Sequence, residues 1–252
     1  MRWFVGDLQG CVKELELLLK EIHFNPGRDE LVCLGDLIRR GPDSLATLRL
    51  WQDIGGTGVI GNHEIHALHI ADGLREPNDE AVACILDAQD GDALMEAIRG
   101  LPVVRRFDAV DGGLPIIAVH AGLHPRWVDL DETIQMFDDI QKEAHWYQHP
   151  SVSFATQVRC CTEAGERSRF TGEPDAAPAP FVPWDCFYRG QSFVVHGHWA
   201  RRGYYRQTKT MGLDSGCVYG GMLSAWCQEE DVVVHIPSLQ PSIRLQEGDK
   251  NH

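Results

Sequence analysis

The 252-residue chain contains 43% hydrophobic and 24% charged residues, proportions typical of globular proteins, which exclude a disordered chain. Its 23 basic and 37 acidic residues give a formal net charge of −14, which disfavours nonspecific binding to nucleic acid or to anionic membranes. An anionic substrate would therefore need metal ions or arginines close to it, because near charges dominate the field at a site.

The eight cysteines include no CxxC pair, and a chain of this length folds without disulfides. Neither a secretory signal nor an apolar run long enough to span a membrane is visible. We therefore expect a cytoplasmic protein with reduced thiols, no membrane association and no obligate protein partner.

Five short apolar runs, each closed by a polar cluster that contains glycine or histidine, are predicted to be strands. They are rich in Val and Ile and apolar on both faces, a pattern typical of buried central strands. In chain order they cover residues 3–5, 31–34, 58–60, 115–119 and 192–195.

Stretches with apolar residues at helical spacing separate several of these runs. In chain order, helices are expected around residues 15–22, from about Pro42 to Trp51, over residues 78–100 with a buried stripe of Leu94, Met95 and Ile98, and over residues 133–145. The pattern fails from about residue 148 to 185, where prolines at 174, 178 and 180 exclude a helix or a central strand. An irregular surface excursion is expected there, either a lid or a plain loop.

Alternating strands and helices predict an α/β fold built from βαβ units. Open α/β sheets bind ligands at the C-terminal ends of their strands, which is where the polar clusters fall. These clusters span most of the chain and meet only if the sheet is shared, so a single domain over residues 1–252 is expected.

Side chains able to bind a metal ion follow all five predicted strands. They are Asp7, Asp36, Asn62 with His63, His120, and either His196 or His198, which point to the same side of a strand. Such mixed ligands suit Mn²⁺, Co²⁺, Fe²⁺ or Zn²⁺. Five ligand-bearing strand ends are too many for one tetrahedral ion and are enough for two ions that share a carboxylate.

A pair of divalent ions clamps a phosphoryl group and lowers the pKa of a water molecule, which predicts hydrolysis of a phosphoester or phosphoanhydride. The reaction also needs a proton donor for the leaving oxygen and cations for the other phosphate oxygens. His63 and Arg40 lie in the right motifs for these two roles.

Each motif alone has a plainer interpretation. A glycine-aspartate pair after a strand is usually only a turn, so the metal hypothesis depends on five clusters occurring together. His66 and His69 continue the helical spacing of His63 and are assigned no role. Cys160 and Cys161 are expected to be buried or inert.

The five motifs together resemble those of the calcineurin-like metallophosphoesterases, in the branch that contains serine/threonine phosphoprotein phosphatases. The motifs are Gly-Asp-x-x-Gly at 6–10, Gly-Asp-x-x-x-Arg-Gly at 35–41, Gly-Asn-His-Glu at 61–64, His120, and Gly-His at 197–198. Residues 6–11, 35–44, 178–184, 197–199 and 213–221 look most like the bacterial symmetrical bis(5′-nucleosyl)-tetraphosphatases, which cleave diadenosine tetraphosphate to ADP. This likeness covers nearly the whole chain.

The resemblance implies mixed β-sheets packed as a sandwich, flanked by helices, with the active site at the C-terminal ends of the strands. It implies two divalent ions, Mn²⁺ or Co²⁺ ahead of Mg²⁺, Fe²⁺ or Zn²⁺. Asp7 and Gln9 would serve the first ion, Asp36 would bridge, and Asn62, His120 and His198 would serve the second. His63 would protonate the leaving group, while Arg40 and, by a looser match, Arg159 would hold phosphate oxygens.

Two positions depart from the wider superfamily. Position 9 is Gln where most members have His, and an amide oxygen is a weaker ligand for the first ion. Position 39 is Arg where protein phosphatases carry an Asp that orients the catalytic histidine. We interpret Arg39 as a further cation for a polyphosphate, which favours a nucleotide substrate over a phosphoprotein.

Three hypotheses follow from the sequence. The first is symmetrical hydrolysis of diadenosine tetraphosphate and related dinucleoside polyphosphates, with removal of dinucleotide-type caps from RNA as an extension of the same chemistry. The second is a serine/threonine-type protein phosphatase on the same scaffold. The third is a noncatalytic nucleotide sensor, suggested by Gln9 and by the missing Asp at position 39.

Overall fold

Strand β1 (Arg2–Val5) buries both of its faces, because successive side chains point in opposite directions. Trp3 and Val5 pack into one hydrophobic cluster and Phe4 into another. Strand β2 (Glu30–Cys33) alternates in the same way. The prediction of buried strands apolar on both faces is confirmed here, and these strands separate two layers of hydrophobic core.

The computed structural model describes residues 1–110 and 112–242. Its further strands are β3 (Thr57–Gly58), β4 (Val104–Phe107), β5 (Ile116–Val119), β6 (Cys160–Cys161), β7 (Val182–Pro183), β8 (Phe193–His196), β9 (Tyr205–Arg206), β10 (Thr210–Gly212), β11 (Asp214–Ser215), β12 (Met222–Cys227) and β13 (Val232–Pro237). One sheet has the order β11-β12-β1-β2-β3, with β13 beside β12, and the other has the order β4-β5-β8-β10-β9. Both are mixed, as expected.

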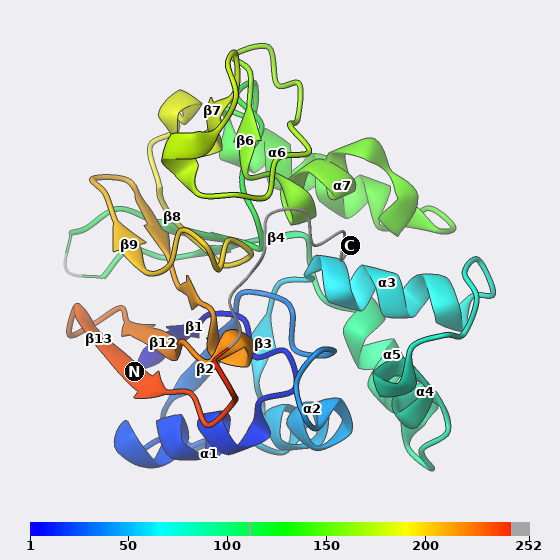
Figure 1. Ribbon diagram of the computed structural model, residues 1–252. Helices are drawn as coiled ribbons and strands as arrows, with labels where there is room; N and C mark the ends of the chain where they lie inside the picture. The colour runs from blue at the N-terminus through cyan, green and yellow to red at the C-terminus, as the bar shows by residue number, and fades with distance from the viewer. Residues whose placement is uncertain (111, 243–252) are drawn as a thin grey trace.

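The two sheets pack face to face, with helices on their outer sides (Figure 1). The α-helices are α1 (Val12–Glu21), α2 (Ser44–Asp53), α3 (Asn62–Ala71), α4 (Glu80–Leu86), α5 (Gly91–Arg99), α6 (Leu130–Ile140) and α7 (Pro150–Gln157). Helices α1 and α2 cover the outside of the first sheet, while α6 and α7 lie on the side of the second. Phe4 of β1 and Phe107 of β4 pack edge to face between the sheets, with their ring centroids 5.1 Å apart.

The strands that carry the polar clusters do not belong to one sheet, so the prediction that all five clusters share a single sheet is wrong. Strands β1, β2 and β3 belong to the first sheet, whereas β5 and β8 belong to the second. Within each group these strands run parallel, so their C-terminal ends point the same way. The face-to-face packing brings the two sets of ends together, and the clusters converge across the sandwich.

Two predicted helices have different limits in the structure. The stretch 78–100 is broken into α4 and α5 around Asp87 to Asp90, and Gly91 opens the second helix, while the stripe of Leu94, Met95 and Ile98 is buried as predicted. The helix predicted over 133–145 is α6, which begins at Leu130. Asp129 caps it by accepting from the backbone N–H groups of Asp131 and Glu132.

The stretch 148–185 is less irregular than predicted. It begins with α7, which has Pro150 in its first turn and His149 as its N-cap. This helix has too few apolar positions to show a helical period in the sequence, so it was not predicted. Strands β6 and β7 then pair with each other and close a loop over residues 162–181. Within the described residues, no helix is both long enough and apolar enough to cross a membrane.

Candidate metal centre

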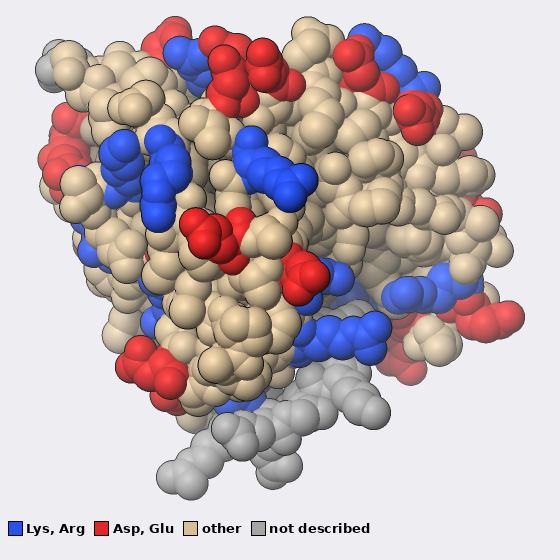
Figure 2. Space-filling model, turned by 90° about the horizontal axis from the view of Figure 1, so that it is seen from above, with Lys and Arg blue, Asp and Glu red and all other residues tan. Residues whose placement is uncertain are grey.

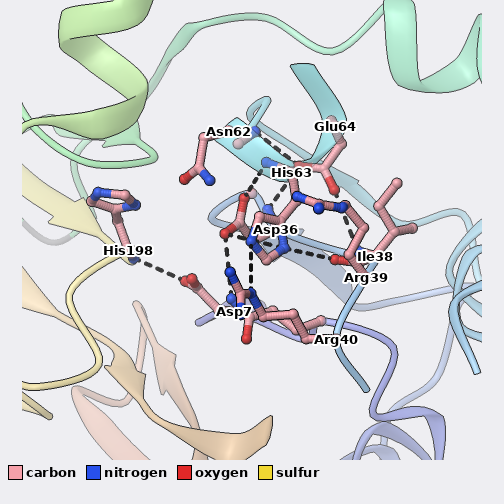
Figure 3. A network of polar contacts seen from close by, with 12 residues as sticks. Asp7, Asp36, Ile38, Arg39, Arg40, Asn62, His63, Glu64 and His198 are labelled. Atoms are coloured by element: carbon pink, nitrogen blue, oxygen red, sulfur yellow. Dashed lines mark hydrogen bonds and ion pairs between the residues drawn. The ribbon is translucent and has the colours of Figure 1, made fainter. Parts of the chain in front are cut away.

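The loop that carries Asp36 is shaped by a buried carboxylate, Glu64 (Figure 3). Its two oxygens accept hydrogen bonds from the backbone N–H groups of Gly61 at 2.9 Å, Asp36 at 2.8 Å and Leu37 at 2.8 Å. Glycine is required at position 61, because a Cβ there would lie 2.2 Å from Oδ1 of Asp36. Glu64 thus joins the second and third motifs, a role that the sequence analysis missed.

Asp7 connects the first sheet to the second. Its Oδ1 accepts the backbone N–H of His198 at 3.0 Å. A Cβ at position 197 would lie 2.1 Å from the same oxygen, so the Gly-His motif leaves room for the carboxylate of Asp7. The other oxygen of Asp7, Oδ2, is buried and has no hydrogen-bond partner.

Asp36, His120 and His198 form a group of potential metal ligands at the joined strand ends. Their ligand atoms lie within 4.8 Å of one another, and all three residues are buried. Nδ1 of His120 lies 2.7 Å from the carbonyl oxygen of Leu34, and Nε2 lies 3.0 Å from Oδ1 of Asn62. When Nδ1–H donates to Leu34, Nε2 presents a lone pair to the centre.

The structure distinguishes between the two histidines that the sequence left open. His198 lies with Asp36 and His120, and its buried Nε2 has no hydrogen-bond partner. Nε2 of His196 lies 2.6 Å from the hydroxyl of Tyr205, away from this group. Gln9, which the resemblance places on the first ion, lies beside Asp36 with its Nε2 3.4 Å from Oδ2.

The buried carboxylates repel one another. Burial raises the pKa of Asp7 well above its usual range, and the charges of Asp214 and Asp36 add to this. Burial and Asp36 raise the pKa of Glu64 to about 8, and burial raises that of Asp214 to about 6. Such crowding is relieved by bound cations, which favour the ionised forms. Asp214 is the second site residue that sequence reasoning missed.

Asp36 differs from the other carboxylates, because its pKa is lowered rather than raised. Burial favours its protonated form, but His120, His63 and the backbone N–H of His63 outweigh this and lower its pKa. Burial lowers the pKa of His120, and burial with Arg159 lowers that of His198 well below the usual range. These imidazoles are therefore neutral at neutral pH, which is the form that binds metal ions.

His63 lies beside the group and contacts Arg40. Its Nδ1 is 2.9 Å from the carbonyl oxygen of Ile38, and Nε of Arg40 donates to its Nε2 at 3.4 Å. Burial, together with the charges of Arg39 and Arg40, lowers the pKa of His63 to about 4, although the charge of Asp36 acts in the opposite direction. Nδ1 is thus occupied by a backbone carbonyl, whereas Nε2 contacts Arg40, a residue that lines the cavity described next.

A cavity of about 90 Å³ opens onto this group. Gln9, Asp36, Asn62, His63 and His198 line it, together with the arginines Arg40 and Arg159. The excursion contributes Thr171 to the wall, and further lining residues are Trp199, Ala200, Arg201, Asp214 and Tyr219. Burial lowers the pKa of Arg159, while the nearby Asp214 and Asp36 favour its charged form.

Arg39 does not lie where the sequence analysis expected it. Its Nε donates to Oδ2 of Asp79 at 2.7 Å in a largely buried ion pair, and Arg39 is not part of the cavity wall. The side chain turns toward α4, because Asp79 caps that helix and offers a carboxylate. The structure therefore does not support the proposed direct contact between Arg39 and phosphate.

Backbone strain is concentrated at these motifs. Of the eight described non-glycine residues with positive φ, five lie in these motifs: Gln9 (45°), Asp36 (52°), Arg39 (75°), Arg40 (64°) and His198 (70°). The other three, His23, His145 and Asp231, lie elsewhere. Each such conformation costs about 1–3 kcal/mol and persists where the surrounding contacts hold it, as is common at functional sites.

Two packed mixed sheets with this carboxylate, amide and imidazole cluster at their joined strand ends define a calcineurin-like phosphoesterase. Residues 2–202 match the model of that family. The chain is 34% identical to the symmetrical bis(5′-nucleosyl)-tetraphosphatase of Cellvibrio japonicus over 91% of this chain and 96% of that protein. It is 35% identical to the same-named protein of Acidovorax sp. over 88% and 89% of the two chains. The chain thus belongs to the calcineurin-like phosphoesterases, in the family of symmetrical bis(5′-nucleosyl)-tetraphosphatases.

Solved structures agree with this assignment of the fold. A crystal structure with a provisional assignment as a diadenosine tetraphosphatase has a TM-score of 0.70 and 30% identity, covering 94% of this chain and 93% of that one. A serine/threonine phosphatase of Saccharomyces cerevisiae has a TM-score of 0.59 at 12% identity, covering 95% and 80%. The second likeness concerns the fold alone.

Proposed function

We propose that this protein hydrolyses diadenosine tetraphosphate and related dinucleoside polyphosphates symmetrically, releasing two ADP from the tetraphosphate. The observation that carries the proposal is the buried group of Asp36, His120 and His198, which opens onto a cavity walled by Arg40 and Arg159. Carboxylates and neutral imidazoles hold divalent ions, and guanidinium groups hold phosphate oxygens. The relatives, similar over most of the chain, supply the substrate class.

The centre fits two divalent ions, with Mn²⁺ or Co²⁺ proposed ahead of Mg²⁺, Fe²⁺ or Zn²⁺. The unpartnered, buried Oδ2 of Asp7 and Nε2 of His198 support this, since buried polar atoms are normally paired. Asp7 and Gln9 would hold one ion, Asn62, His120 and His198 the other, and Asp36 would serve both. Bound ions would supply charge neutralisation and a water molecule of lowered pKa.

The residues around the ions would then position the substrate and the proton. Arg40 and Arg159 would fix the non-bridging phosphate oxygens. His63 would protonate the departing ADP from Nε2, because Nδ1 is occupied by the carbonyl oxygen of Ile38. A polyanionic substrate next to His63 favours its imidazolium form and so opposes the effect of burial on its pKa.

The decisive experiment separates the products. Purified protein with Mn²⁺ or Co²⁺ and diadenosine tetraphosphate should yield ADP alone. Equal amounts of ATP and AMP would refute symmetrical cleavage, and faster turnover of a phosphopeptide than of the dinucleotide at equal concentration would favour the protein phosphatase hypothesis.

Variants test whether the centre is catalytic. Asp36→Ala and His63→Ala should lower kcat by at least about 100-fold, because metal binding and proton transfer each contribute that much or more. His69→Ala, a change on the same helix outside the centre, is the control. No metal-dependent hydrolysis by the wild type would favour the sensor hypothesis, whereas full activity in Asp36→Ala would show that Asp36 is not part of the catalytic centre.

We also propose that the same centre removes nucleoside caps from the 5′ ends of RNA. Only the tetraphosphate of a nucleoside-capped 5′ end would need to reach the cavity, so a long basic groove is not required. On the face seen in Figure 2, basic and acidic side chains are interspersed rather than gathered into such a groove. Release of a diphosphate-ended RNA from a short capped transcript would support the proposal, and an intact cap would contradict it.

A further inference from the structure

The central cavity is too small to hold a nucleoside. Its volume of about 90 Å³ suits ions, water and phosphate groups, whereas sites for drug-sized molecules occupy roughly 300 to 1,000 Å³. A dinucleotide that reacts at the centre must therefore place both nucleosides outside it. A second cavity of about 500 Å³ adjoins the first, and Arg40 lines both.

The second cavity lies beside Arg40, which contacts the residue proposed to protonate the leaving group. The guanidinium of Arg40 contacts Nε2 of His63, the atom proposed to protonate the departing oxygen. In an in-line displacement the leaving group departs opposite the attacking water. The half of the substrate that leaves past His63 is therefore directed over Arg40 into the second cavity.

The lining of the second cavity suits a nucleoside better than further phosphates. Asp43, Asp79 and Glu80 contribute carboxylates and Asn78 an amide, and Arg40 is the sole basic residue on its described wall. Carboxylates repel phosphate and accept hydrogen bonds from ribose hydroxyls and from amino groups of a base. Cys84 of α4 adds part of the less polar wall and is exposed.

Arg39 gains a structural role in this arrangement. Its ion pair with Asp79 fastens the start of α4 to the strained loop of Arg39 and Arg40, with both side chains largely buried. Nε2 of His66 also lies 3.4 Å from Oδ2 of Asp79. These contacts fix the wall formed by Asn78 to Cys84 relative to the phosphate-binding Arg40.

We propose that the second cavity, between Arg40 to Leu45 and Asn78 to Cys84, binds the nucleoside of the departing half of the substrate. The inference rests on the proposed function and adds to it the place of one nucleoside. It assigns specificity for a nucleoside end to α4 and to the segment that leads into α2.

Cys84→Trp tests the inference by filling the second cavity. The ratio of kcat/KM for diadenosine tetraphosphate to kcat/KM for p-nitrophenyl phosphate, which has no nucleoside, should fall about ten-fold or more, chiefly through KM of the dinucleotide. Cys186→Trp, at the other exposed cysteine and outside both cavities, should keep the wild-type ratio. The thermal midpoints of both variants show whether they are folded.

A second measurement fills the cavity after the protein has folded, so its result does not depend on whether Cys84→Trp folds. Folded Cys186→Ser protein, labelled at Cys84 with a bulky maleimide, should show the same fall in the ratio. An unchanged ratio in both the variant and the labelled protein would overturn the inference while leaving the proposed function intact. A wild-type protein that cleaves p-nitrophenyl phosphate and not the dinucleotide would overturn both.

Discussion

At the scale of single residues, the loop of Asp36 depends on Glu64. Replacing Glu64 by Ala leaves four backbone N–H groups buried without this acceptor, those of Gly61, Asp36, Leu37 and Ile38. Unpaired buried donors cost about 1–3 kcal/mol each, so we expect a loss of at least about 4 kcal/mol in the free energy of unfolding. Urea denaturation measures this loss. Glu64→Gln, which keeps one acceptor, should lose less, and equal losses would contradict the hydrogen-bond explanation.

Asp214 offers a test of charge at the centre. Asp214→Asn keeps an acceptor for the N–H of Gly216, bonded at 3.0 Å, and removes one negative charge beside Asp7 and Asp36. Weaker attraction for cations should raise the Mn²⁺ concentration for half-maximal activity by roughly ten-fold, equal to about 1.4 kcal/mol. An unchanged metal dependence would place Asp214 outside the electrostatics of the centre.

Single residues also mark the limits of prediction from this sequence. Asp36 and His120 were proposed because polar clusters after apolar runs mark strand ends. The same pattern left His196 and His198 open, and only the family resemblance favoured His198. Glu64 lies inside a recognised motif, yet nothing in its spacing shows that it accepts four backbone hydrogen bonds. Arg39 was assigned to phosphate because sequence shows neighbours along the chain and not the direction of a long side chain. Its carboxylate partner lies 40 residues away.

At the scale of elements, the segment after His198 is held by a buried ion pair. Arg202 donates to Asp185 at 2.9 and 3.2 Å, and Asp185 also accepts from the hydroxyl of Tyr205. Arg202→Met leaves the carboxylate of Asp185 buried without its cation, which should cost about 3 kcal/mol or more in the free energy of unfolding. Urea denaturation measures this cost.

Two further variants give that prediction its controls. Asp185→Asn combined with Arg202→Met removes both charges and should recover part of the stability. Arg49→Met breaks the exposed pair with Asp90 and should cost less than about 1 kcal/mol. A loss for Arg202→Met as small as that for Arg49→Met would contradict the importance of burial.

Elements were predicted better in their kind than in their limits. A strand lies at each of the five expected places, because apolar runs closed by glycine have few other solutions. The third is shorter than predicted, since β3 covers only Thr57–Gly58 and leaves Val59 and Ile60 outside it. The observed limits of a helix differ from the predicted ones where a capping side chain sets its start, as Asp129 does for α6. The division of the strands between two sheets did not follow from alternation, because periodicity contains no information on which strands pair.

At the scale of the whole molecule, buried histidines link stability to pH. Burial, together with the charges of Arg39 and Arg75, lowers the pKa of His66 to about 4. Unfolding restores a value near 6.5, so between pH 6.5 and 4 the unfolded chain binds more protons and His66 destabilises the folded protein. Asp7, Glu64 and Asp214 have raised pKa values and act in the opposite direction.

A variant isolates this histidine from the carboxylates. In the presence of a chelator, the free energy of unfolding of the wild type minus that of His66→Gln should fall as the pH is lowered from 6.5 to 4. Urea denaturation at several pH values measures the difference. A difference that does not change with pH would show that His66 titrates normally in the folded protein.

The pairing of β12 with β1 has a consequence for how the protein is made. β12, formed by residues 222–227, lies between β11 and β1, so one of the last strands synthesised completes the sheet that the first strand begins. We propose that the chain folds as one domain for this reason. On the ribosome, a nascent chain that ends before Met222 would already contain every proposed ligand, yet it would expose one edge of β1. Such chains should aggregate rather than acquire activity, and the active centre should appear only when synthesis is nearly finished.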